Sequence, residues 1–269
     1  MLVYSLIRVI IALVLAATCG CRGLPPRAAL PDAHEMHLGQ LLIRSNFELS
    51  QDDAMVRALM WEREDVCRTL GLPCSEELIE VHLFRDADTY RQYLARHFPT
   101  VPSRRAFFVE SDTRLAVYAH WSDRVAEDLR HEVAHGYLHS MVPGLPLWLD
   151  EGLAEFFEVP HRQAGLNPPH LDLLSEMMRE GWRPDLVKLE RLTDAAQMEQ
   201  LDYAEAWAWV YFLLHSDPER RELLTGYLAE LRAHSLVDPL SRRLQQQAVE
   251  PERMLGDYLA GLSQGAMLR

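Results

Sequence analysis

The chain has 269 residues, of which 48% are hydrophobic, and its 40 acidic residues against 27 basic ones give a formal net charge of −13. This length suits one compact domain, or a catalytic half joined to a helical half. Because contact with nucleic-acid phosphates requires a basic surface, the acidic balance disfavours a nucleic-acid partner.

Residues 1–21 have the pattern of a secretion signal. Arg8 supplies a positive charge, and the apolar run 9–17 that follows is about nine residues long, too short to span a bilayer. The small residues that come next resemble a bacterial lipobox, with Cys21 as the predicted acylated residue and Cys19 or simple cleavage as alternatives. We therefore expect the protein outside the cytoplasm, anchored through lipid to a bacterial membrane if Cys21 is acylated and otherwise exported.

Three parts are expected after the signal. Residues 22–36 form a tether, residues 37–160 form the part that carries the chemistry, and residues 161–269 form a helical part that packs on it. Helices are predicted near 52–70 and 86–97. Cys67 and Cys74 are the two cysteines beyond the signal, and in an oxidising compartment they could form a local disulfide or remain as free buried thiols.

Alternating and apolar runs predict strands at 78–84, 106–110 and 114–119. Residues 111–113 join the last two as a hairpin. The fold class predicted is α+β with a small mixed sheet.

The run HEVAH places His131 and His135 four residues apart on a predicted helix within 121–138. Side chains at this spacing lie about 6 Å apart along one helix face, so two imidazoles can bind one ion. Glu132 lies roughly 100° around the helix, where it can accept a proton from a metal-bound water without being a ligand. His139 cannot join the same site, because eight residues turn and lengthen the helix too far. It is interpreted as a surface residue or a partner of the helix dipole.

The segment WLDEGLAEFF, which begins at Trp148, is predicted to start a second helix near 147 and carries Glu151 and Glu155 one turn apart. It resembles the glutamate helix of gluzincin zinc metallopeptidases, and with the HEVAH run and the lipoprotein-like start the chain is similar to peptidase MA-like predicted bacterial lipoproteins. The resemblance covers about residues 40–235 and is most specific between Arg130 and Glu158. It implies a zincin-like fold and one zinc ion held by His131, His135 and Glu151.

Further roles follow from the same resemblance. Glu155 would hydrogen-bond His131, and Gly152 would let the glutamate helix approach the metal helix closely. An edge strand beside the metal helix binds substrate in zincins, which makes Arg114, Leu115, Ala116 and Val117 the expected substrate strand, with a plain structural hairpin as the alternative.

Tyr203 opens an aromatic run on a helix predicted at 201–214, and a tyrosine recurs after the glutamate helix in similar sequences. It is a candidate stabiliser of the oxyanion, with a place in the core as the alternative. Further helices are predicted at 171–179, 219–233 and 251–262.

The function expected is that of a zinc-dependent metallopeptidase, with Glu132 as general base and peptides or proteins as substrates. Endopeptidase action is preferred, because the segment that anchors a free amino terminus in related aminopeptidases is absent from the sequence. Two other readings stay open: a catalytically silent zinc-binding scaffold or binding lipoprotein, and a zinc hydrolase of a non-peptide amide.

Overall fold

The computed structural model describes residues 29–100, 104–234 and 236–267. The expected signal segment and the Cys21 acylation site lie outside these residues. The described part contains a five-stranded sheet with strands β1 (His34–Leu38), β2 (Leu41–Ser45), β3 (Ile79–Phe84), β4 (Ala106–Ser111) and β5 (Arg114–His120). Its ten α-helices are α1 (Ala54–Leu70), α2 (Ala87–His97), α3 (Val125–Met141), α4 (Leu147–Phe157), α5 (Pro168–Arg179), α6 (Leu186–Leu189), α7 (Gln200–His215), α8 (Pro218–Ala233), α9 (Leu240–Gln247) and α10 (Pro251–Met267).

The strand order is β1-β2-β3-β5-β4. Strand β3 is parallel to both β2 and β5, whereas the β1-β2 and β4-β5 pairs are antiparallel, so the sheet is mixed. The three predicted strands and the hairpin are confirmed, and β1 and β2 are additional. Strand β1 begins at His34, which is three residues before residue 37, where the part after the tether was expected to begin.

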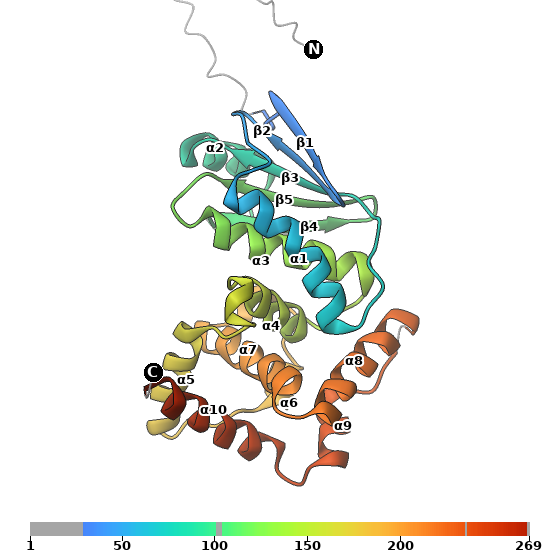
Figure 1. Ribbon diagram of the computed structural model, residues 1–269, viewed down its shortest axis with the longest axis vertical. Helices are drawn as coiled ribbons and strands as arrows, with labels where there is room; N and C mark the ends of the chain where they lie inside the picture. Colours follow the sequence, from blue (N-terminus) through green and yellow to red (C-terminus); the bar gives the residue numbers. More distant parts are fainter. Residues whose placement is uncertain (1–28, 101–103, 235, 268–269) are drawn as a thin grey trace, which may run out of the picture.

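Helices cover both faces of the sheet (Figure 1). On β5, Leu115, Val117 and Ala119 face the large core that contains α1 and α3. Tyr118 faces the opposite way, into a smaller aromatic core that contains Tyr90 of α2. This alternation follows from the two-residue period of a strand.

The chain after α3 is helical, which confirms the expected α+β class with a helical C-terminal part (Figure 1). Helix α4 lies between α3 and α7. A Cβ on Gly152 would lie 2.5 Å from the carbonyl oxygen of Ala206 on α7. The missing side chain thus serves contact with α7, and the expectation that it serves contact with the metal helix is wrong.

Cys67 and Cys74 form a disulfide at the C-terminal end of α1, so the structure selects one of the two alternatives. Gly71 ends the helix with φ 66°, a conformation that glycine adopts without steric cost. Among the described residues, no helix is both long and apolar enough to cross a membrane.

Candidate metal centre

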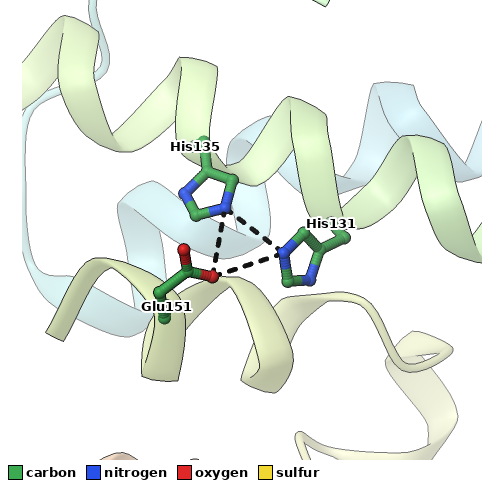
Figure 2. Close-up of side chains that lie close together, drawn as sticks. All are labelled: His131, His135 and Glu151. Carbon is green, nitrogen blue, oxygen red and sulfur yellow. Dashed lines mark hydrogen bonds and ion pairs between the residues drawn. The ribbon is translucent and has the colours of Figure 1, made fainter. Parts of the chain in front are cut away.

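Two helices that are consecutive in the chain bring the candidate ligands together. Helix α3 carries Glu127 and Asp128 in its first turn, where carboxylates interact favourably with the helix dipole. The chain then turns at Gly144, whose φ is 73°, and Pro146 precedes the first residue of α4. As a result α4 packs against α3 with Glu151 facing the two histidines of HEVAH (Figure 2).

His131, His135 and Glu151 form a compact triangle. The Nε2 atoms of the two histidines are 3.3 Å apart, and Glu151 Oε2 lies 3.6 Å from Nε2 of His131 and 3.7 Å from Nε2 of His135. A point equidistant from three such atoms is about 2 Å from each, which matches the bonds that zinc makes to imidazole nitrogen and carboxylate oxygen. The three residues therefore fit a small divalent cation, as the spacing in the sequence predicts.

The charges around the triangle suit a cation as well. Burial acts to lower the pKa of the His131 imidazole, but Glu151 and Glu158 raise it well above its ordinary value. The pKa of Glu151 is lowered despite burial, because both imidazoles stabilise its charged form. A proton held by the His131 imidazole would be released when a metal ion binds.

Glu132 is 9% exposed and lines a cleft together with His131. Burial raises the pKa of its carboxyl, and the imidazoles of His131 and His135 oppose that shift. A carboxyl with a raised pKa exchanges protons closer to neutral pH than an ordinary glutamate does.

His135 is oriented by a chain of polar contacts that extends to the sheet. Its Nδ1 lies 2.9 Å from Asp150 Oδ1, while His139 Nε2 donates to Asp150 Oδ2 at 2.9 Å. Glu110 Oε2 on β4 accepts from His139 Nδ1 at 2.7 Å. His139 is half-buried and paired on both sides, so its interpretation as a surface residue is wrong.

The expected partner of His131 is also corrected. Glu158 Oε2 lies 3.1 Å from His131 Nδ1, and Glu158 Oε1 accepts from Asn167 Nδ2 at 2.9 Å. Glu155 instead pairs with His170 Nε2 at 2.7 Å. The reason is helical phase. Glu158 is the residue that follows the end of α4, and because it comes seven residues after Glu151, it lies on the same face as Glu151.

The strand expected to bind substrate is not an edge strand. Residues Arg114 to Val117 lie on β5, which pairs with β3 on one side and β4 on the other, so its backbone is fully engaged. The edge strand next to α3 is β4. Its Phe108 ring stacks on His135 with centroids 6.0 Å apart and meets His139 edge to face at 5.0 Å.

Tyr203 enters the same region from α7. Burial raises the pKa of its hydroxyl, as does the nearby Glu151 carboxylate, whereas Arg104 and His131 lower it. The hydroxyl therefore lies close enough to Glu151 and His131 for their charges to change its pKa. The side chain is only partly buried.

Several contributing residues were not identified from the sequence. Glu158 has a signal, because a spacing of seven from Glu151 repeats the helix face. Asp150 adjoins a candidate ligand and could have been proposed as its partner. Glu110 and Phe108 have no comparable signal, because only the pairing of β4 at the sheet edge brings them to the site.

Comparison with known proteins gives a family match in the second half of the chain. Residues 125–238, which include α3, α4 and α7, match a family described as "Protein of unknown function (DUF1570)". No curated protein matches the chain.

Proposed function

We propose that the protein is a zinc-dependent metallopeptidase of the gluzincin type, with a zincin-like fold, that cleaves within peptide chains. The observation that carries the proposal is the triangle of His131, His135 and Glu151, with Glu132 beside it. Two imidazoles and one carboxylate leave an open coordination position, which is the arrangement of catalytic zinc sites. Export and a lipid anchor at Cys21 belong to the same proposal.

Each residue then has a chemical role. Bound zinc would activate a water and polarise the substrate carbonyl. Glu132 accepts the proton of that water and passes it to the leaving amine, which its raised pKa favours. Tyr203 would donate a hydrogen bond to the oxyanion that forms on the carbonyl oxygen.

The edge of β4 that faces away from β5 pairs with no other strand among the described residues, and it is a candidate for substrate binding. Arg105 O accepts from His120 N, so in an antiparallel pair the backbone groups of every second residue, Phe107 and Val109, point toward β5. The backbone groups of Phe108 therefore point away from β5, while its ring stacks on His135. An extended peptide could pair with them and place a scissile bond near the ligands.

The experiment uses the chain without residues 1–21, compared with Glu132→Gln and with Glu64→Gln, a control at an exposed glutamate of α1. We expect about one zinc per chain in all three proteins, by elemental analysis, and peptide cleavage by the wild type and Glu64→Gln alone. Peptide mixtures read by mass spectrometry give the cleaved bonds.

Other outcomes separate the alternatives. Zinc without cleavage in the wild type would favour the scaffold reading, and hydrolysis of simple amides without peptide cleavage would favour the non-peptide hydrolase. Equal cleavage by wild type and Glu132→Gln would refute the assigned base.

A further inference from the structure

A second cavity lies apart from the three candidate ligands and has a volume of about 560 Å³. It is lined by α1, by Arg130 at the near side of α3, by the end of α4 with the loop that follows, and by the neighbouring ends of α7 and α8. Pockets that bind small organic molecules range from about 300 to 1,000 Å³. The cavity is therefore large enough for a ligand, and none of His131, His135 and Glu151 lines it.

One wall holds a carboxyl group that has no partner. Glu62 of α1 is 5% exposed, and neither of its carboxyl oxygens has a hydrogen-bond partner among the described residues. Leaving a buried polar group without a partner costs about 1–3 kcal/mol, so such groups normally find one. Burial raises the pKa of Glu62 well above its ordinary value, although the positive charge of Arg130 acts to lower it.

The cavity is basic rather than acidic. Arg130 donates its Nε hydrogen to the carbonyl of Glu158, and among the described residues its terminal nitrogens have no carboxylate within ion-pair distance. Arg221 lies at the rim, and it too forms no ion pair with a described residue. Asp65, the acidic residue of the lining besides Glu62, is paired with Arg68 at 2.6 Å and with His161 at 2.9 Å.

The remaining wall is apolar. Phe156 and Phe157 form its deep part, and the exposed Trp61 stands at the rim. Gly165 presses directly on the ring of Phe156, since a Cβ there would lie 1.9 Å from it, so that ring is held in place. A guanidinium without an ion pair and a fixed aromatic wall are complementary to a carboxylate on an apolar body.

We propose that this cavity binds a small amphipathic monocarboxylate, with its carboxylate at Arg130 and its apolar body against Phe156 and Phe157. The proposal is independent of peptidase action, because it rests on binding alone.

The test is calorimetric titration of the zinc-loaded protein with dodecanoate, compared with dodecanol as a probe of the same chain length without charge. We expect one dodecanoate per chain and much weaker binding of dodecanol. Arg130→Met should weaken dodecanoate binding about tenfold or more, the loss of one charge-assisted hydrogen bond. Arg179→Met, a surface arginine outside the cavity, should leave it unchanged.

A second variant keeps the test decisive if Arg130→Met disturbs the fold. Ala58→Phe adds bulk to the wall contributed by α1 and should abolish binding while the circular dichroism melting curve stays that of a folded protein. Equal binding of dodecanol and dodecanoate, binding unchanged in a folded Ala58→Phe protein, or no binding by the wild type would overturn the proposal.

Discussion

His139 on α3 donates a hydrogen bond from Nε2 to Oδ2 of Asp150 on α4, at 2.9 Å. The other oxygen of Asp150 contacts the candidate ligand His135, so His139 acts on that ligand through one intermediate. Burial alone would lower the pKa of His139, but Asp150 and Glu110 raise it to about 9. The imidazole is therefore charged at neutral pH and holds Asp150 in position.

His139→Gln should weaken zinc binding about tenfold, because loss of an outer contact to a ligand commonly costs 10- to 100-fold in metal affinity. Competition with a chromophoric chelator measures the affinity. His37→Gln, an exposed histidine on β1, is the control and should bind zinc as the wild type does. Unchanged zinc affinity in His139→Gln would show that His139 does not position Asp150.

Glu151→Ala should remove zinc from the purified protein, whereas Glu155→Ala should retain about one ion per chain. Glu151 lies in the triangle, and Glu155 is paired with His170 outside it. The measurement is elemental analysis after dialysis against buffer with trace zinc. The ligand assignment fails if the two variants lose zinc equally.

Phe108→Pro should raise KM for peptides more than Phe108→Ala does. Both variants lose the ring that stacks on His135, but only proline also lacks the backbone N–H that points to the free edge. Proline is tolerated on edge strands because it leaves the ladder to β5 intact. Similar KM values for the two variants would argue against peptide pairing with β4.

Gly152→Ala should destabilise the protein by about 1–3 kcal/mol, the usual range for overpacking in a tight core. The new Cβ would collide with the backbone of Ala206, which cannot move without shifting α7. Gly226→Ala is the matched control on α8, where a Cβ meets nothing within 4 Å. It should stabilise the helix by about 0.5–1 kcal/mol. Urea unfolding gives both values.

Glu205→Gln tests a buried carboxyl away from the ligands. Burial raises the pKa of Glu205 from 4.5 to about 7, against the hydrogen bonds from Asp185 N and Trp209 Nε1. The folded state then binds more protons than the unfolded one, so the stability that Glu205 contributes is fully present below pH 4.5 and is lost as the pH rises through about 7.

Relative to wild type, the Gln variant should therefore gain stability between pH 5 and pH 8, by up to about 3 kcal/mol. Unfolding in urea at several pH values measures the difference. A constant difference across this range would mean that Glu205 titrates normally.

The sequence predicted those parts of the site that depend on local helix geometry. His131 and His135 share a face because they are four residues apart, and Glu151 opens the next helix after a proline-rich turn. Strand β3 and the β4-β5 hairpin were also predictable, since their residues alternate or form apolar runs.

The order of the strands was not predictable from the same patterns. Arg114 to Val117 and the residues of β4 have similar alternation, and only the pairing of β5 with β3 decides which strand is at the edge. The partner of Gly152 was missed for a related reason: a glycine indicates a close approach, but not which helix approaches.

The triangle draws two ligands from α3, which packs on the sheet, and one from α4, which packs on the long buried helix α7. An ion bound there would link α3, on the sheet side of the molecule, to α4, on the side of the helical part. Removal of the ion would then loosen the contact between α3 and α4 before the rest of the protein unfolds, and amide hydrogen exchange would accelerate first at the facing turns of these two helices.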